Sequence, residues 1–425
     1  MKLVNLKDHS EQLSFTEAVV KGIGREQGLF FPEKIEPLAD IDSLLDLPLV
    51  ERSQKILRHL IGDELDCLED IIADAFTFKA PVVKADENIY ALELFHGPTL
   101  AFKDFGARFM ARVLGAVRGD RKLTILTATS GDTGAAVADA FYGQKGIEVV
   151  VLYPKGKISS LQEKLIATLG GNIHAVSVEG IFDECQDLVK TAFDDLEFKN
   201  AVGLNSANSI NISRLLAQVS YYFEAVAQLA PEKRGKVVFS VPCGNFGNIT
   251  AGLIAKALGL KARFVISCNA NDTVPRYLKT GVWEPHKTIA TLSNAMDISR
   301  PNNWPRVEAL CRMQGWSLSS FDFGAMSDAM TEETMRSLYK RTGYVAEPHA
   351  AIAYQILKDN LKEGETGIFL GTAHPAKFKS DVDRILGTDI SLPDALEKRV
   401  QLTSQSVTLK PDYEGLRSFV LKTVG

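Results

Sequence analysis

The chain has 425 residues, which is too many for one small core, so we expect two or three domains. Its hydrophobic content of 45% and charged content of 24% are those of an ordinary globular protein. The 48 basic and 53 acidic residues give a net charge of −5, which argues against nucleic acid as the main partner.

The sequence carries no targeting or metal-binding signal. No apolar run reaches the length of a membrane span, and the N-terminal residues MKLVNLKD lack the apolar core of a signal peptide. The five cysteines lie far apart without a C-x-x-C pair, as is typical of reduced thiols, and the seven histidines show no metal-binding spacing. We therefore expect a cytoplasmic protein with no metal site and no membrane contact.

The first part of the chain differs from the rest. Residues 1–80 have a helical pattern that is acidic around residues 40–74, and the segment GLFFP at residues 28–32 is typical of a turn. We interpret residues 1–85 as a mainly helical N-terminal extension packed on the rest of the protein.

One lysine stands inside an apolar, glycine-bounded run. The segment HGPTLAFKDFG (residues 96–106) surrounds Lys103 with apolar residues, and further apolar residues follow at helical spacing, which predicts Lys103 near the start of a buried helix. Because burying an ammonium without a partner is costly, such a lysine tends to lose its proton and can form a Schiff base with an aldehyde. The alternative is a lysine whose stem covers apolar neighbours while its ammonium reaches solvent.

From residue 120 onward, strands alternate with helices. The predicted strands cover residues 123–128, 148–153, 173–178, 236–241, 263–267 and 367–370, and the predicted helices cover residues 135–142, 182–194 and 213–229, with another opened by a capping box at Ser159 and Gln162. This alternation indicates parallel sheets covered on both faces, in two series, with ligands bound in the crevice between them.

We therefore expect an α/β fold with two doubly wound parallel-sheet domains and the N-terminal extension. The large domain would comprise residues 86–119 and 232–425, and the small domain residues 120–231. Residues 269–343 have an irregular pattern, and RPNNWP at residues 300–305 is a long polar connection. Such a connection is either a functional lid or a plain surface loop.

Two glycine-containing loops stand between a strand and a helix, where backbone N–H groups can bind an anion. The first is TSGDTG at residues 129–134, which offers the side chains of Ser130, Asp132 and Thr133. A capping turn with Asp132 or Thr133 as N-cap is the alternative. Ala128 replaces the first glycine of a nucleophile elbow, so a serine hydrolase is not expected.

The second loop can hold a phosphate without any basic side chain, although a tight turn would give the same pattern. It consists of Gly244, Asn245, Phe246, Gly247 and Asn248. The loop is neither the dinucleotide fingerprint nor a Walker loop, because the required glycines and lysine are absent.

Two further polar segments lie at strand or helix ends. In NSANSINISR (residues 205–214), Arg214 would lie in the first turn of a helix, where a bound anion could offset the unfavourable dipole. An exposed, solvated arginine is the alternative. In GTAHPAKF (residues 371–378), Thr372 follows a strand at the end where α/β sheets bind ligands. We interpret His374 and His349 as structural hydrogen-bond partners.

Five motifs, in this order, resemble those of the threonine synthase family, whose members are pyridoxal-phosphate enzymes of the tryptophan-synthase-β fold (fold type II). They are HGPTLAFKDFG, TSGDTG, NSANSINISR, PCGNFGN and GTAHPAKF. Together with GLFFP, they resemble the longer branch of the family, which has an N-terminal extension. The resemblance covers essentially the whole chain.

The resemblance implies pyridoxal 5′-phosphate as the cofactor, bound as a Schiff base to Lys103. It implies that Asp132 approaches the cofactor's 3′-oxygen, where the shorter branch has asparagine, and that Thr372 faces the pyridine nitrogen. The implied cofactor-binding residues are Lys103, Asp132, Gly244, Asn245, Phe246, Gly247, Asn248 and Thr372. The implied substrate-binding residues are Ser130, Thr133, Asn208, Ser209, Arg214 and Asn248, with Arg214 on the substrate's phosphate.

The implied reaction converts O-phospho-L-homoserine and water into L-threonine and phosphate, the last step of threonine biosynthesis, with the cofactor as electron sink. The nearest alternative is another lyase of this fold, such as a threonine dehydratase or a phospholyase. A catalytically silent homologue is a second alternative. We expect an enzyme for a small-molecule substrate, as a monomer or homodimer.

Overall fold

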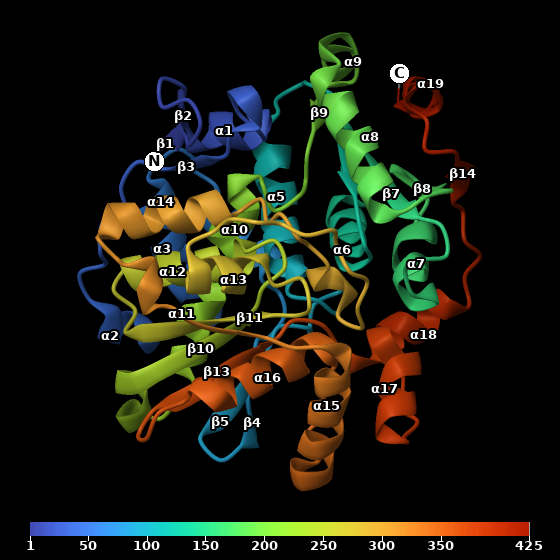
Figure 1. Cartoon of the computed structure of the whole chain (residues 1–425). Helices are drawn as coiled ribbons and strands as arrows, with labels where there is room; N and C mark the ends of the chain where they lie inside the picture. Colours follow the sequence, from blue (N-terminus) through green and yellow to red (C-terminus); the bar gives the residue numbers. More distant parts are fainter. Residues whose placement is uncertain (425) are drawn as a thin grey trace.

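Six strands form the larger of two parallel sheets in the computed structural model, which describes residues 1–424 (Figure 1). Their order across the sheet is β12-β11-β10-β13-β5-β4, and every neighbouring pair is parallel except β4 and β5. The strands are β4 (Val82–Asp86), β5 (Ile89–Glu93), β10 (Val237–Pro242), β11 (Ala262–Cys268), β12 (Asp322–Ala325) and β13 (Thr366–Gly371).

Helices connect the strands and begin where the sequence provides caps. Ser159 and Gln162 form the predicted capping box of α7, because each side chain accepts from the other's backbone N–H. The predicted helix over residues 182–194 is α8, whereas the one over residues 213–229 is divided into α10 and α11. The helices after the N-terminal part are α5 (Lys103–Val117), α6 (Asp132–Phe141), α7 (Ser160–Ala167), α8 (Phe182–Asp194), α9 (Leu196–Val202), α10 (Ile212–Ala217), α11 (Val219–Ala227), α12 (Gly247–Ala257), α13 (Thr273–Thr280), α14 (Trp304–Gln314), α15 (Asp328–Thr342), α16 (Pro348–Asn360), α17 (Lys379–Leu386), α18 (Asp394–Val400) and α19 (Tyr413–Val424).

Alternating apolar side chains bury both faces of the larger sheet. In β10, Val237, Phe239 and Val241 pack into the main core, while Val238 packs into a second cluster. Residues of α12 contribute to the main core and residues of α16 to the second cluster, so the two helices cover opposite faces. The predicted α/β fold, with helices on both faces of a parallel sheet, is confirmed.

The smaller sheet has five parallel strands in the order β14-β8-β7-β6-β9. Ile125 and Val149 point into the main core, which is shared with the larger sheet, and Leu126 and Val150 point into a separate cluster with α8 and α9. The main core is therefore continuous between the two sheets. The strands are β6 (Leu123–Ala128), β7 (Ile147–Pro154), β8 (Ile173–Val178), β9 (Leu204–Asn205) and β14 (Val407–Leu409).

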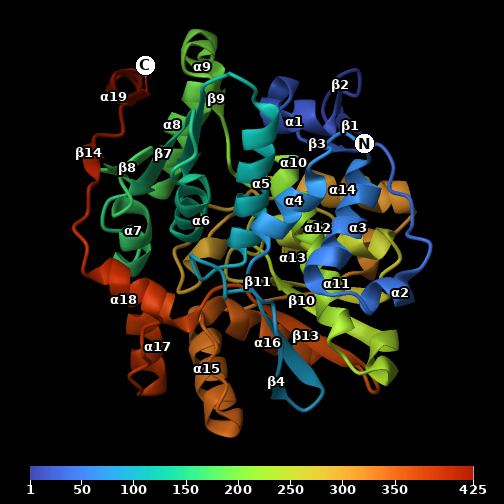
Figure 2. The same ribbon diagram turned by 180° about the vertical axis from the view of Figure 1, so that it is seen from behind.

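The N-terminal extension contains a small antiparallel sheet in addition to helices. The prediction that residues 28–32 form a turn is wrong for the last three, because Phe30 and Phe31 are buried in β3, which pairs with β1. The helices α3 and α4 lie against α11 and α5, respectively (Figure 2). The elements are β1 (Lys2–Asn5), β2 (Gln12–Ser14), α1 (Phe15–Lys21), β3 (Phe30–Pro32), α2 (Ile41–Leu45), α3 (Leu49–Ile61) and α4 (Leu68–Ala75).

Residues 269–343 are more regular than expected, since they contain α13, β12, α14, α15 and the 3₁₀ turn η3 (Asn294–Met296). Polar side chains organise the loop between these elements. The Asp297 carboxylate accepts hydrogen bonds from the side chains of Asn269, Asn271 and Thr291 at 2.7–3.1 Å. Apolar periodicity does not record such contacts.

The C-terminal part returns to the smaller sheet. β14 pairs with β8, and α19 packs against α8 and α9 (Figure 1). The predicted limits assigned β14 and α19 to the large domain, and they ended the N-terminal extension at residue 85, inside β4. The division of the chain into domains stays a prediction. Within residues 1–424, no helix combines the length and apolarity needed to cross a membrane.

Candidate active site

Lys103 is the first residue of α5, as predicted. The residues before it pair with the segment after β13: Ala101 forms an antiparallel bridge with Ala373, and the Phe102 N–H donates to the Thr372 carbonyl at 2.9 Å. Leu100 has a φ of 58°, a left-handed conformation that is rare for a bulky residue and concentrates at functional sites. Lys103 is thereby fixed at the carboxyl end of β13, on the segment paired with Thr372.

The surroundings of Lys103 favour its neutral amine. Although the side chain is partly exposed, burial by the surrounding protein is the main cause that lowers the pKa of Lys103 to about 8. The positive charges of Lys377 and Arg214 act in the same direction, and the Asp132 carboxylate opposes them. With this pKa, roughly one amine in ten is neutral at pH 7, as a nucleophilic lysine requires.

A second lysine, Lys377, joins the ends of the two sheets. It is fully buried, and its Nζ lies 2.6 Å from Oδ1 of Asp132 and donates to the Thr99 carbonyl at 2.9 Å. Gln162 donates to the same carboxylate oxygen at 3.2 Å. Burial acts to raise the pKa of Asp132, but the charges of Lys377 and Lys103 outweigh it and hold that pKa well below its usual range.

The Lys377 pairing was not predicted from the sequence. Lys377 stands between Ala376 and Phe378, an apolar setting like that of Lys103, so its burial could have been predicted, although its partner could not. The alternative interpretation of Asp132 or Thr133 as an N-cap is wrong, because Gly131 is the N-cap residue of α6 and makes no side-chain cap.

The loop Gly244–Asn248 leads into the N-terminus of α12 with its backbone tightly enclosed. Phe246 is the N-cap residue and has a left-handed φ of 60°. A Cβ added at Gly244 would lie 2.8 Å from the Cα of Met296, so only glycine fits beside η3. Gly247 begins α12, whose first N–H groups are free of helical partners and can bind an anion.

Asn248 is held by two buried tyrosines. Its Oδ1 accepts from the hydroxyls of Tyr221 and Tyr222 at 2.6 and 2.7 Å. Its Nδ2, however, is buried without a hydrogen-bond partner in the described part of the chain. The two tyrosines therefore fix the amide orientation and leave its N–H groups for a ligand.

Arg214 is buried, which contradicts the alternative of an exposed arginine. Only 2% of the residue is accessible, and burial lowers the pKa of its guanidinium to about 10. One Nη donates to the carbonyl of Ala207, while the buried Nε lacks a partner within residues 1–424. Arg214 lies against Gly106 in α5, where an added Cβ would be 2.9 Å from Nε.

The segment of residues 205–214 contacts the second anion-binding loop and the strand before the first. Asn208 accepts a hydrogen bond from Thr127, near the end of β6, at 2.6 Å. The Asn245 amide of the second loop donates to the Ser209 hydroxyl at 2.7 Å. Of the predicted residues in this segment, Ser209 is thus bonded to the second loop and Asn208 to the strand that leads into the first.

The N-terminal extension braces the same segment. The buried Arg306 donates to the carbonyls of Phe30 and Ile210 at 2.8 and 2.7 Å, and Asn211 donates to the carbonyl of Val19 at 3.0 Å. None of these residues was predicted to act near the site. Through these contacts the extension, which lies outside both parallel sheets, supports residues 205–214.

Three predicted residues have fewer contacts. Thr372 is buried at the end of β13 and accepts the Phe102 N–H through its carbonyl. Ser130 and Thr133 are partly exposed at the start of α6, and their side chains make no hydrogen bond to another predicted residue within residues 1–424. Their roles stay predictions.

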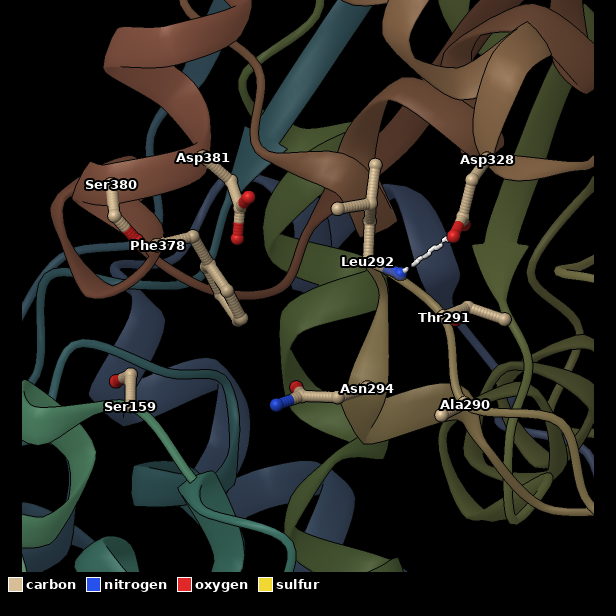
Figure 3. Close-up of a pocket in the computed structure, with 9 residues that line it drawn as sticks. All are labelled: Ser159, Ala290, Thr291, Leu292, Asn294, Asp328, Phe378, Ser380 and Asp381. Carbon is tan, nitrogen blue, oxygen red and sulfur yellow. Dashed lines mark hydrogen bonds between the residues drawn. The ribbon is translucent and has the colours of Figure 1, made fainter. Parts of the chain in front are cut away.

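A cavity of about 380 Å³ lies between the start of α7 and the segment that precedes η3. Asn294 and Phe378 extend toward it, opposite Ser159 (Figure 3). None of the predicted site residues lines it. The cavity adjoins the site through Ser159, whose hydroxyl donates to the Lys377 carbonyl at 3.2 Å.

His349 and His374 have the structural role that was predicted. His349 accepts the Ala295 N–H at 3.2 Å, which anchors η3, and His374 accepts the Ala376 N–H at 3.1 Å.

The residues present fit a phosphorylated aldehyde. Buried polar atoms without partners are costly, and two of the orphaned nitrogens in the described chain, Arg214 Nε and Asn248 Nδ2, belong to predicted site residues and are hydrogen-bond donors. Together with the N-terminus of α12, they suit anionic groups, while the amine of Lys103 suits a carbonyl carbon.

The fold and this lysine site define a pyridoxal-phosphate-dependent enzyme of fold type II. In agreement, residues 76–371 match the family described as pyridoxal-phosphate dependent enzyme. Residues 4–76 match the threonine synthase N terminus, and residues 350–420 match the threonine synthase C-terminal family.

Full-length relatives narrow the class. The chain is 65% identical to threonine synthase from Haemophilus influenzae, with 100% of both chains covered. The crystal structure of threonine synthase from Escherichia coli has a TM-score of 0.96 at 58% identity, covering 99% of this chain and 100% of that one. The PLP-bound threonine synthase from Brucella melitensis has a TM-score of 0.92 at 35% identity, covering 100% and 99%, respectively. The chain belongs to the threonine synthase family, and the alternative lyases are not favoured.

Proposed function

We propose that the chain converts O-phospho-L-homoserine and water into L-threonine and phosphate, with pyridoxal 5′-phosphate attached at Lys103. Family membership over the full length supports the reaction, and the environment of Lys103 supports the attachment. When bound, the cofactor supplies an electron sink beside the substrate's Cα.

The observation that carries the proposal is the buried guanidinium of Arg214. Within residues 1–424 no carboxylate forms an ion pair with it, and its Nε has no partner. A buried cation without a counter-charge is unfavourable, and a guanidinium binds phosphate through two parallel hydrogen bonds. We infer that the phosphate of the substrate is the missing partner.

The motif residues also suggest which groups bind the cofactor. We infer that the backbone N–H groups of Gly244–Asn248 bind the cofactor's phosphate, with the Asn248 amide close by. Thr372 would present a neutral hydroxyl to the pyridine nitrogen, and Asp132 would approach the 3′-oxygen. Because Lys377 keeps Asp132 ionised, that residue would act as a fixed acceptor.

The substrate-binding roles fall on the small-sheet loops. Ser130, Thr133, Asn208 and Ser209 would hold the amino-acid part of the substrate by hydroxyl and amide hydrogen bonds. Once displaced from the cofactor, the Lys103 amine would remove the proton from the substrate's Cα. Closure of one sheet domain toward the other would exclude water from the site until the hydration step.

Product analysis tests this function. The purified holoenzyme is given O-phospho-L-homoserine, and phosphate and threonine are measured for the wild type, Arg214→Gln and the control Arg118→Gln. We expect equal amounts of both products from the wild type. Only Arg214→Gln should lose about 100-fold in kcat/KM, because the substrate's phosphate would no longer have a cationic partner. Ammonia and a 2-keto acid as main products would show that the chain is a dehydratase instead.

We further infer that the protein acts in the cytoplasm on a small-molecule substrate, without a nucleic-acid partner, as a monomer or homodimer. The net charge of −5 supports the inference about nucleic acid, and the similarity to bacterial threonine synthases supports the inferences about substrate and location. Sedimentation at several protein concentrations would distinguish monomer from dimer.

A further inference from the structure

Lys377 is a fully buried cation for which the proposed reaction gives no role. Its ammonium has two partners, Oδ1 of Asp132 at 2.6 Å and the carbonyl of Thr99 at 2.9 Å. Thr99 lies in the same segment as Lys103, four residues earlier. Lys377 therefore holds the carboxylate next to the segment that carries the reactive lysine.

Asp132 is arranged so that its carboxylate is satisfied without Lys103. Gln162 donates a further hydrogen bond to Oδ1, and the Gln162 side chain is itself fixed by the capping box with Ser159. Within the described chain, Lys103 forms no ion pair, and its ammonium lies 5.7 Å from the centre of the Phe102 ring. The charge of Asp132 thus acts on both lysines, and only Lys377 is bonded to it.

Four further charged or titratable groups act on this pair of lysines and their acid. They are Asp104 on α5, Arg214 on α10, His349 on α16 and His374 after β13. Because Arg214 and His349 are not bonded to Asp132, loss of the Lys377 ammonium would leave Lys103 as the cation able to take its place. An unpaired buried carboxylate is costly, so such a replacement is favourable.

We propose that Lys377 is a positioning residue: by occupying the carboxylate of Asp132, it prevents an ion pair between Asp132 and Lys103 and keeps the Lys103 amine free to react. This inference rests on the proposed role of Lys103 as the reacting lysine. A purely structural role would leave the acid–base behaviour of Lys103 unchanged when Lys377 is replaced.

The test measures the pKa of Lys103 directly in the full chain without substrate or cofactor. Trace labelling with acetic anhydride from neutral pH to about pH 11 modifies only neutral amines, and mass spectrometry of the peptide containing Lys103 gives the midpoint. We expect a wild-type midpoint near 8. Lys377→Met should raise this midpoint by about one unit or more, which reduces the neutral amine tenfold per unit at lower pH.

A second-site variant separates the proposed role from a structural one. In Lys377→Met/Asp132→Asn, the carboxylate that would capture Lys103 is gone, so the midpoint should return to the wild-type value or below it. Asp132→Asn alone should lower the midpoint. Lys379→Met is the matched control, because Lys379 pairs with Asp383 at 2.6 Å, and it should leave the midpoint unchanged.

Either of two outcomes would overturn the proposal: a wild-type midpoint in Lys377→Met, or a double variant that keeps the raised midpoint. Circular dichroism and urea unfolding establish that each variant is folded. If Lys377→Met does not fold, Lys377→Gln takes its place, because its amide can still donate a hydrogen bond to Asp132 while the positive charge is removed. Lys377→Gln should likewise raise the midpoint, and a wild-type midpoint in that variant would refute the role of Lys377. Because no substrate is used, the result is independent of the reaction catalysed.

Discussion

Two glycines in the helix that begins with Lys103 should respond in opposite ways to alanine. Gly106 and Gly115 both lie inside α5, where alanine favours the helix over glycine by about 0.5–1 kcal/mol. At Gly115 the added Cβ would be 3.5 Å from Gln144, an ordinary contact. Gly115→Ala should therefore raise the free energy of unfolding by about 0.5–1 kcal/mol.

At Gly106 the same methyl group meets Arg214, the arginine that we propose binds the substrate's phosphate. Its Cβ would lie 2.7 Å from the Arg214 carbonyl oxygen and 2.9 Å from Nε. Overpacking of this kind costs about 1–3 kcal/mol, which exceeds the helix gain. We expect Gly106→Ala to lower the free energy of unfolding by about 1 kcal/mol and to displace the guanidinium.

Urea unfolding measures the first effect, and steady-state kinetics with O-phospho-L-homoserine measures the second. A displaced Arg214 should raise KM by at least about tenfold, because misplacement of one ångström can cost about 100-fold in rate. Gly115→Ala is the control and should keep wild-type kinetics. A Gly106→Ala variant as stable and active as Gly115→Ala would refute the inferred contact with Arg214.

Three further predictions concern buried polar groups. Burial raises the pKa of Asp104 to about 6, above its value in the unfolded chain, so ionisation of Asp104 lowers wild-type stability as pH rises from about 4 to 6. Relative to the wild type, the free energy of unfolding of Asp104→Asn, measured with urea, should therefore increase by up to about 3 kcal/mol across this window. Tyr222→Phe removes one of the hydrogen bonds that orient Asn248, so it should lower the free energy of unfolding by about 1 kcal/mol and make the cofactor dissociate faster. Visible absorbance during dialysis measures this dissociation. Asn211→Ala removes the N-cap of α10 and the bond to Val19, and should lower the free energy of unfolding by about 1–2 kcal/mol.

Each of these predictions has an outcome that contradicts it. A stability difference between Asp104→Asn and the wild type that does not change with pH would exclude a raised pKa. Tyr354→Phe is the control, because it removes a tyrosine hydroxyl that donates to Asp86 outside the site, and it should not change cofactor retention. An Asn211→Ala variant with wild-type stability would mean that the cap contributes nothing.

The sequence predicted the elements whose residues are close together in the chain. Apolar periodicity placed Lys103 at the start of a helix, and β-rich runs predicted β6 and β8 with their observed bounds. The motif order identified the threonine synthase family. These successes share one cause, because local spacing and motif residues are recorded in the sequence itself.

The parts that could not be predicted depend on contacts between distant residues. Nothing near Lys377 indicates that Asp132 is its partner, and nothing near Arg214 indicates that Gly106 makes room for it. The loop held by Asp297 is ordered by amide and hydroxyl groups, which have no periodic pattern. Strand β3 has only three residues, too few for a signal that differs from a turn.

The return of the C-terminal part to the smaller sheet has a consequence for biosynthesis. Until residues 407–409 have been synthesised, β8 is an open edge strand whose free backbone groups can pair with another chain, a recognised route to aggregation. Once β14 is in place, the exposed edge is a strand of three residues, two of them solvent-facing. The last strand made therefore protects the finished chain, but not the nascent one, from edge-to-edge association, and truncation before Val407 should remove that protection.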